Sequence, residues 1–319
     1  TWMRRVDEEG PDALVRKPPV NKYPELVTQI VSTLGYVAPM LGSKRIAQWL
    51  AGLGLVLSAS TVRRRKQQKP AAPPTETSES PKPSAVTTKG HGVVAKHEHH
   101  VWHIDLTFLP TTGPWVPWLP FALPIIFPFY FCLAGVVDQW SRRVVGWKLF
   151  LREPTAKKVV SMLDAAVAAQ GRGPTHIISD QGPQFRTEYL DWCEAKGAKP
   201  RFGAVGKHGS IAVIERFWRT LKSEGWRRLV TLPWSLQAAS AEIGVFVDWY
   251  HEHRPHHGIG GQRPGLRGKR VRRQPRIEVR RGYCSVRDHP RRVKYVEQLR
   301  LSVEPFRGRE HLPVLSLHY

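Results

Sequence analysis

The chain has 319 residues, enough for more than one domain at roughly 100–200 residues each. Its net charge of +23 and pI of about 10.4 indicate a polyanionic partner, above all nucleic acid, rather than a merely basic surface. The three cysteines stand far apart without a C-x-x-C pair, which argues against a disulfide scaffold or a cysteine zinc site and is typical of a reducing cytosol.

Residues 1–68 are predicted to form a helical region whose beginning precedes Thr1. Apolar spacing predicts a helix from Pro24, and Ser43 is expected to cap a second helix that ends near Gly54. A short basic helix follows a tight turn, so the parts of a DNA-binding helix-turn-helix are present. Its predicted DNA contacts are Thr61, Arg63, Arg64, Arg65 and Lys66; the alternative is a small helical bundle with a solvated basic end.

Residues 69–97 are predicted to be a flexible linker. Within it, 70–92 holds five prolines, seven Ser or Thr and no Leu, Ile, Met or aromatic residue, so it cannot bury a core. Three histidines stand at its edge, and without partner cysteines a solvated cluster is favoured over a metal site. They are His97, His99 and His100.

Residues 98–262 are predicted to form an α/β domain. V-W-H-I-D-L-T-F at 101–108 alternates as a strand, and Asp105 on it needs a partner or a cation because burial of a lone carboxylate is costly. Two antiparallel strands, a helix, a short strand ending at Asp180, a helix from Thr187, another strand and two helices follow. This order predicts a mixed sheet flanked by helices.

The uncharged span from Leu106 to Val137 raises the possibility of a transmembrane helix. Its six prolines argue against one, since each interior proline costs about 3 kcal/mol of helix stability. We therefore interpret 110–128 as an apolar loop that covers the core or makes a subunit contact, and no membrane partner is expected.

The helix around Glu215 combines charge with an apolar stripe. Glu215, Arg219 and Lys222 have the spacing of one helical face, and the apolar stripe on the other side comprises Ile211, Ile214, Trp218 and Leu221. A carboxylate here and another at a strand end suit a divalent metal, and the cations suit a phosphate-bearing substrate.

The C-terminal part, 263–319, combines a basic segment with a small β module. Nine of the 19 residues from Arg263 to Arg281 are Arg or Lys, and alternation further on predicts strands. The candidate DNA contacts in this segment are Arg270, Arg272 and Arg273, and Lys207 in the Gly-rich loop before Glu215 is another.

Taken together, the motifs resemble the DDE integrase core of retroviral integrases and insertion-sequence transposases, which has a ribonuclease-H-like fold. The matching segments are W-H-I-D-L-T, V-V-D-Q-W-S-R-R-V-V-G-W, S-D-Q-G-P-Q-F, E-R-F-W-R-T-L-K and W-Y-H-E-H-R-P-H-H-G-I-G-G-Q-R-P, within about 101–265. The resemblance implies that Asp105, Asp180 and Glu215 bind two Mg²⁺ ions, with Mn²⁺ as a substitute, and that Lys222 contacts DNA.

The same resemblance implies a transposase that binds the double-stranded ends of a mobile element, cuts them and joins them to target DNA as a homo-oligomer. Its expected location is the bacterial cytoplasm, in association with the nucleoid. Three departures stand out: the spacing from Asp180 to Glu215 is one residue short of the commonest, G-S-I replaces D-N-A before Glu215, and the apolar insert is long. Two alternatives stay open, a ribonuclease-H-like nuclease without joining activity and a catalytically silent DNA-binding derivative.

Overall fold

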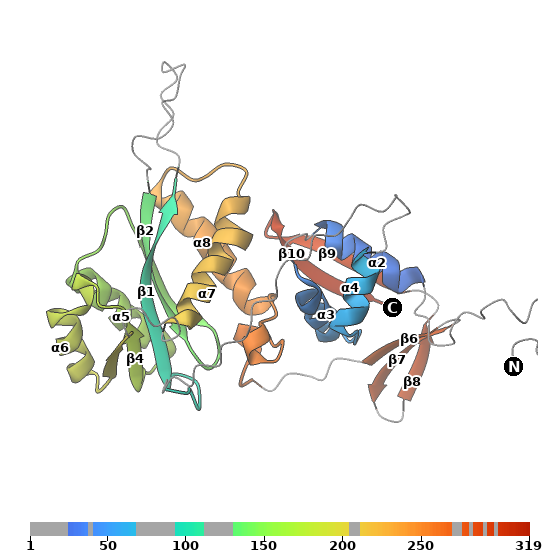
Figure 1. Cartoon of the computed structure of the whole chain (residues 1–319), viewed down its shortest axis with the longest axis horizontal. Coiled ribbons are helices and arrows are strands. Elements are labelled where there is room, and N and C mark those ends of the chain that lie inside the picture. The colour runs from blue at the N-terminus through green and yellow to red at the C-terminus, as the bar shows by residue number, and fades with distance from the viewer. Residues whose placement is uncertain are drawn as a thin grey trace, which may run out of the picture. The chain divides into compact units, whose positions relative to one another are not determined.

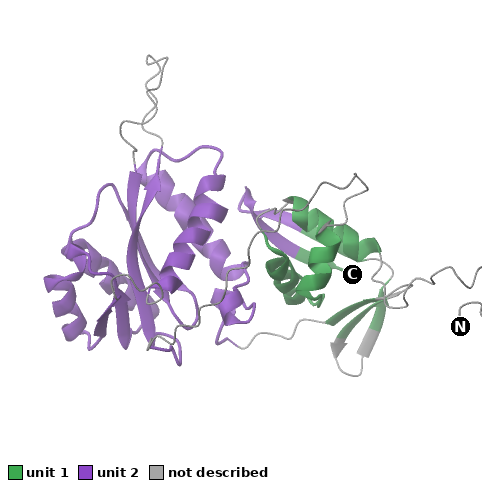
Figure 2. Ribbon diagram, in the orientation of Figure 1, with its two compact units in different colours: residues 1–72, 273–302, 316–319 green, residues 73–272, 303–315 purple. Residues whose placement is uncertain are grey.

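The computed structural model describes residues 25–37, 41–67, 93–111, 130–203, 211–269, 276–280, 283–289, 292–296 and 299–319. The chain divides into two compact units (Figure 2). Unit 1 comprises residues 1–72, 273–302 and 316–319, and unit 2 comprises 73–272 and 303–315. None of the described helices has both the length and the apolar character needed to cross a membrane.

A five-stranded mixed sheet forms the centre of unit 2 (Figure 1). Its order is β3-β2-β1-β4-β5, with β1–β2–β3 antiparallel and with β4 and β5 parallel to β1. The strands are β1 (Val101–Pro110), β2 (Tyr130–Asp138), β3 (Val144–Phe150), β4 (His176–Ser179) and β5 (Lys199–Phe202). The mixed sheet and the element order predicted from the sequence are therefore confirmed.

Helices cover both faces of this sheet (Figure 1). On one side lie α5 (Ala156–Gln170) and α6 (Thr187–Ala195), and on the other α7 (Ala212–Thr220) and α8 (Leu236–Glu252). The predicted ends of α5 are confirmed, with Thr155 at the N-cap and Gly171 at the C-cap in the left-handed region that favours glycine. A core of Trp102, Ile104 and their β2, β3, α5 and α6 neighbours fills the first side.

Strand β1 is buried on both faces over most of its length, as the sequence predicted, and Phe108 and Pro110 near its end are exposed. The alternation places Trp102 and Ile104 in the α5–α6 core, as expected. On the opposite face His103 and Thr107 are also buried, because α7 packs over this side of β1 and β2. Asp105 therefore lies between a sheet and a helix rather than on a solvated face.

A short π-helix interrupts the run from α7 to α8. It spans Leu221–Gly225, and the 3₁₀ turn Trp226–Arg228 follows it. Other 3₁₀ turns span Pro183–Phe185, His257–Ile259 and Pro264–Leu266. Inside the π-helix the buried Glu224 carboxylate accepts two hydrogen bonds from the buried Arg254 guanidinium, at 2.7 and 3.0 Å. This pair ties the segment after α7 to the end of α8.

The C-terminal hairpin of β9 (Arg300–Phe306) and β10 (Arg309–His318) supplies 303–315 to unit 2. Arg309 forms an ion pair with Glu242 on α8 at 2.5 Å, and Arg307 pairs with Asp248 at 2.7 Å. The Trp249 indole donates to the Pro313 carbonyl at 2.9 Å. The chain beyond residue 302 thus returns to pack on the last helix of the core.

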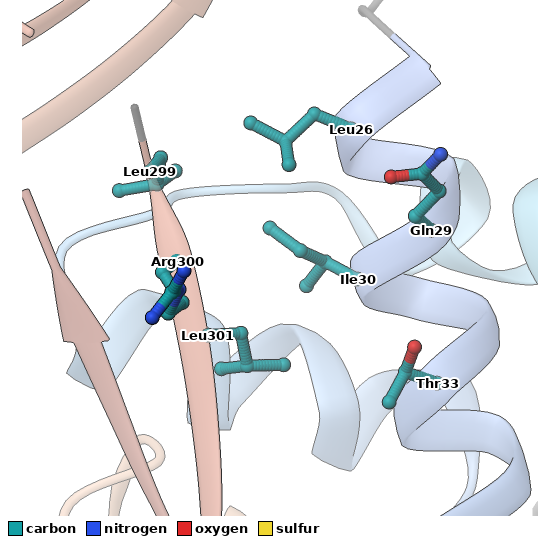
Figure 3. A pocket seen from close by; sticks show the side chains of 7 residues that line it. All are labelled: Leu26, Gln29, Ile30, Thr33, Leu299, Arg300 and Leu301. Atoms are coloured by element: carbon teal, nitrogen blue, oxygen red, sulfur yellow. The ribbon is translucent and has the colours of Figure 1, made fainter. Parts of the chain in front are cut away.

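Unit 1 joins three helices to strands from the C-terminal part. The helices are α2 (Glu25–Val37), α3 (Ser43–Gly52) and α4 (Ala59–Gln67), and the sheet contains β6 (Arg276–Arg280), β7 (Tyr283–His289) and β8 (Arg292–Val296). The Ile277 amide donates to the Gly54 carbonyl at 3.0 Å, which attaches β6 to the turn before α4. A groove of about 450 Å³ separates α2 from the start of β9 (Figure 3).

The predicted cap of the second helix was wrong. Helix α3 begins at Ser43 itself, Gly42 occupies the N-cap position and no side chain caps it. The serine that caps a helix start in this unit is Ser58, whose Oγ accepts the Thr61 amide at 3.1 Å. Three helices with a tight turn before α4 are present, and their action as a DNA-binding helix-turn-helix stays a prediction.

Candidate active site

Asp105 lies in the middle of β1, the central strand of the sheet. Its Oδ1 accepts the Leu106 amide at 2.8 Å, and its Oδ2 accepts the Trp218 indole N–H at 3.0 Å. A carboxylate offers about four acceptor positions, so each oxygen keeps capacity for a further ligand. Within the described part of the chain, Asp105 forms no ion pair.

Asp180 follows β4 directly and begins the D-Q-G turn. Its Oδ1 accepts the Gly182 amide at 3.1 Å, which is ordinary Asx-turn chemistry and leaves the other oxygen without a donor in the described residues. The β1–β4 ladder pairs Trp102 with Ile177 and His103 with Ile178. The same offset relates Asp105 to Asp180, so the parallel register places Asp180, just after the end of β4, level with Asp105 in the middle of β1.

Glu215 lies in the first turn of α7, on its exposed side. Of the predicted apolar stripe, Ile214, Trp218 and Leu221 are buried, whereas Ile211 at the N-cap is only partly buried. Phe217 is buried as well, against Phe246 and Tyr250 of α8. One turn of helix separates Glu215 from Trp218, the residue that reaches Asp105. Helix α7 therefore carries Glu215 on its exposed side and, through Trp218, donates a hydrogen bond to Asp105.

The three acids are electrostatic neighbours. Burial raises the pKa of Asp105 to about 6, and the charges of Asp180 and Glu215 add to the effect. The hydrogen bonds from Trp218 and Leu106 oppose it only in part. Even so, no three acidic, histidine or cysteine side chains of the described segments lie close enough together to hold a metal ion.

The donor set nevertheless fits a divalent cation. All three candidate ligands are carboxylates, the ligand type that Mg²⁺ and Mn²⁺ prefer. Asp105 is a largely buried acid beside two others, with only N–H donors to offset its charge. A cation at this position would offset the cost of burial and the repulsion from Asp180 and Glu215, which together raise the pKa of Asp105.

Lys222 does not share an α-helical face with Glu215 and Arg219, because α7 ends at Thr220 and Lys222 lies in the π-helix. The Asp105 charge still acts on it. Burial lowers the pKa of Lys222, Arg227 lowers it further, and Asp105 opposes the shift. Arg219 is exposed in the last turn of α7 and Lys222 is partly buried, and contact of either side chain with DNA stays a prediction.

The remaining predicted DNA contacts fall into two groups. Arg63 and Arg64 are exposed on α4, whereas Thr61 is buried against Ser58, so its predicted contact with DNA was wrong. The Arg65 guanidinium donates to Thr28 Oγ1 at 3.1 Å, and the Lys66 ammonium donates to the Leu41 carbonyl at 3.2 Å. DNA contact by these basic side chains stays a prediction. Lys207, Arg270, Arg272 and Arg273 lie outside the described residues.

Sequence reasoning misjudged one of the three histidines before β1. His99 is buried, and its amide donates to Asp138 Oδ1 at 3.0 Å while its Nδ1 accepts the Trp102 indole at 3.2 Å. Asp138 Oδ2 in turn accepts the amide and hydroxyl of Ser141. His99 and Asp138 therefore stabilise the edge of the sheet, and a solvated role for His99 was wrong.

Much of the motif W-Y-H-E-H-R-P is structural. His251 is largely buried, and its Nε2 accepts the Val144 amide of β3 at 2.9 Å, while Arg254 pairs with Glu224. The role of Trp218 was missed altogether, because the sequence pattern assigned it only to the apolar stripe. The one feature of the sequence that could have indicated this bond is the position of Trp218, one helical turn after Glu215.

Two family models match the chain in overlapping segments. Residues 95–208 match one described as "Integrase core domain", and 196–264 match a second with the same description. The chain belongs to the integrase core family. Together the two matches span more than half of its length and all three candidate acids. The resemblance to DDE transposases and integrases is thereby confirmed.

Three viral integrase structures are among the solved structures to which the chain is similar. The HTLV-2 integrase catalytic core domain in complex with magnesium shares 19% identity over 53% of this chain and 94% of its own, with a TM-score of 0.39. The catalytic core domain of BIV integrase is 20% identical in sequence, and the match covers 52% of this chain and 91% of the BIV chain, with a TM-score of 0.38. A chain of the simian T-cell lymphotropic virus intasome in complex with PP2A regulatory subunit B56 gamma is 14% identical in sequence. The match covers 91% of this chain and 99% of that chain, with a TM-score of 0.43. No curated protein matches this integrase core chain.

Proposed function

We propose that this chain is a DNA transposase or integrase that cuts the ends of a mobile element and joins them to target DNA by metal-dependent transesterification. The observation that carries the proposal is Asp105, a partly buried acid on the central strand of an integrase core whose charge is coupled to those of Asp180 and Glu215. An acid that only N–H donors contact, beside two others, is suited to hold divalent cations.

The residues divide the work between ligand binding and substrate placement. Asp105, Asp180 and Glu215 would hold two Mg²⁺ or Mn²⁺ ions. When bound, such a pair of ions supplies an activated water or 3′-hydroxyl and a stabilised leaving oxygen. Lys222 and Arg219 extend from the same helical run and would hold the adjoining phosphates, as cationic side chains do along a DNA backbone.

DNA binding is expected to extend beyond the core. Arg63 and Arg64 are exposed in unit 1, and the whole chain carries a charge of +23. Two element ends must be joined in one event, so we propose a homo-oligomer on DNA that acts at the bacterial nucleoid. Because every phosphate contact releases counterions, binding should weaken steeply as salt is raised.

The test uses the inverted repeats that flank the gene as substrate. The wild-type chain with Mg²⁺ or Mn²⁺ should nick these duplexes and join pre-cut ends to a target plasmid. Asp180→Asn should bind the same duplex and produce no joined product. A fully active Asp180→Asn variant would rule out the triad assignment.

Two other results would favour the alternative functions. Cleavage without joining, when pre-cut ends are supplied, would indicate a ribonuclease-H-like nuclease. Binding of the repeat with no metal-dependent change to it would indicate a silent DNA-binding derivative. A shallow dependence of binding on salt would count against DNA as the partner.

A further inference from the structure

The buried Trp218 donates its indole N–H to a candidate metal ligand, Asp105. Only 6% of its surface is exposed, and its ring packs with the apolar side of α7. A buried indole N–H needs an acceptor, and two other tryptophans of unit 2 use backbone carbonyls. Trp226 donates to Pro110 at 2.7 Å and Trp249 to Pro313 at 2.9 Å. Trp218 donates instead to Oδ2 of Asp105, at 3.0 Å.

The neighbouring strand leaves the space that this indole needs. Gly135 on β2 stands directly opposite Asp105 in the antiparallel ladder, so the two residues share one face of the sheet. A β-carbon at Gly135 would lie 2.5 Å from Cη2 of Trp218 and 3.2 Å from its Cζ2. Any other residue here would push the ring away from the acid. The bond from Trp218 to Asp105 therefore depends on the absence of a side chain at Gly135.

Helix α7 and the Trp218 indole connect two candidate metal ligands, Glu215 and Asp105. Trp218 is held by α7, and Glu215 lies one turn earlier on the same helix. The indole is planar and reaches from α7 to the acid on β1, so it fixes how far the helix stands from Asp105. Together with the Leu106 amide it also places one donor on each carboxylate oxygen, which prevents the group from turning.

We propose that Trp218 is a positioning residue for the metal site, which orients Asp105 and sets its separation from Glu215, and that Gly135 admits its ring. The inference rests on the proposed function, because it assigns Trp218 to the ligand set through which that function acts. Partners that orient metal ligands typically change metal affinity or activity by about 10- to 100-fold when they are removed. Neither Trp218 nor Gly135 need touch the DNA or the ions.

A matched control exists in the same unit. Trp192 on α6 is also buried and donates its indole N–H to a carboxylate, Asp164 Oδ1, at 2.9 Å. That acid also pairs with Lys196, away from the three candidate ligands. Trp192→Phe therefore removes the same kind of bond with the same loss of volume, and it should leave the metal site unchanged.

The experiment compares the whole chain with its Trp218→Phe, Gly135→Ala, Trp192→Phe and Asp105→Asn variants. Binding of Mn²⁺ is measured by electron paramagnetic resonance, thermal unfolding is measured without metal, and strand transfer is measured across a Mn²⁺ titration. We expect Trp218→Phe to raise the Mn²⁺ concentration for half-saturation by about 10- to 100-fold. Its unfolding temperature without metal should match that of Trp192→Phe. Gly135→Ala should weaken Mn²⁺ binding in the same direction.

The outcomes separate this inference from the proposed function. If the wild type binds Mn²⁺ and joins ends, Asp105→Asn does neither, and Trp218→Phe behaves like Trp192→Phe, then the positioning role is refuted and the proposed function stands. If the wild type shows neither Mn²⁺ binding nor joining, both fall together. Should Gly135→Ala fail to fold, Trp218→Phe decides the question alone, because it removes the donor and Trp192→Phe matches its loss of volume.

Discussion

Two carboxylates, Glu224 and Asp105, lie close to α7 and the π-helix that follows it, and they differ in the groups that offset their negative charge. Glu224 is buried in the π-helix and accepts two bonds from the Arg254 guanidinium, which is itself 3% exposed. Asp105 is held by an amide and an indole, and it forms no ion pair within the described part of the chain. One acid has its cation inside the protein and the other has only neutral donors.

The difference indicates which acid stabilises the fold and which is kept for chemistry. A buried pair of opposite charges satisfies itself, and removal of either partner leaves an uncompensated charge. A buried acid beside other acids is held at a cost, which is typical of groups with a functional role. Glu224 and Arg254 thus stabilise the segment that follows α7, whereas Asp105 is suited to bind a cation from outside the protein.

The largest expected effect comes from Asp105→Asn. Strand transfer should be abolished, because an amide replaces an anionic ligand. The free energy of unfolding without metal should not fall at neutral pH, and we expect a rise of about 1–2 kcal/mol. The reason is that burial and the neighbouring acids raise the pKa of Asp105 to about 6, so its ionised form is disfavoured in the fold. Urea unfolding in the presence of a chelator measures this change, and a marked loss of stability would contradict the contrast with Glu224.

Arg254→Met should have the opposite signature. The substitution leaves Glu224 charged and buried, and it should cost about 3–5 kcal/mol of unfolding free energy. A double variant, Arg254→Met with Glu224→Gln, should recover part of that loss because no buried charge remains. Urea unfolding of the three proteins measures both numbers. Equal stability of the single and double variants would show that the unpaired charge of Glu224 is not the source of the loss.

A third expectation concerns acid and His251. Its Nε2 accepts the Val144 amide, so the fold requires the neutral ring. Burial lowers its pKa to about 4, Arg143 and Lys269 lower it too, and Asp248 opposes them. Since the pKa is lower in the fold than in the unfolded chain, stability is complete above about pH 6.5 and is lost as the pH falls toward 4.

The loss from His251 should reach about 2 kcal/mol by pH 5. Unfolding free energies of the wild type and of His251→Gln, measured between pH 7.5 and 4.5, test this. The variant should be less stable at pH 7.5 and should change less with pH. Because His103 is buried with a pKa also lowered to about 4, the wild-type profile contains both groups, and only the difference between the two proteins isolates His251.

The elements that sequence reasoning predicted correctly depend on local signals. Alternation marked β1, the residues Thr155 and Gly171 marked the ends of α5, and a Gly-Pro turn after an apolar run marked Asp180. Each of these features is decided by residues close together in the chain. The predicted antiparallel pairing of β2 with β3 follows in the same way, since a short turn joins the two strands.

The features that were missed depend on distant partners. The π-helix forms where Glu224 meets Arg254, thirty positions further along the chain. The bond from Trp218 to Asp105 depends on how α7 lies over β1 and on the absence of a side chain at Gly135. The attachment of β6 to Gly54 joins opposite ends of the sequence. No local pattern contains the register between such segments, so only the structure could reveal them.

The smallest expected effect comes from an ion pair at the surface. Asp248 and Arg307 lie 2.7 Å apart, close to the spacing in the buried pair, but their side chains are 44% and 53% exposed. Water screens such a pair, so Asp248→Asn should cost only about 0.2–1 kcal/mol, and the cost should shrink further in 1 M salt. Urea unfolding at low and high salt measures it beside Arg254→Met, whose cost should change little with salt. A surface pair that cost as much as the buried one would show that distance rather than burial decides what an ion pair contributes here.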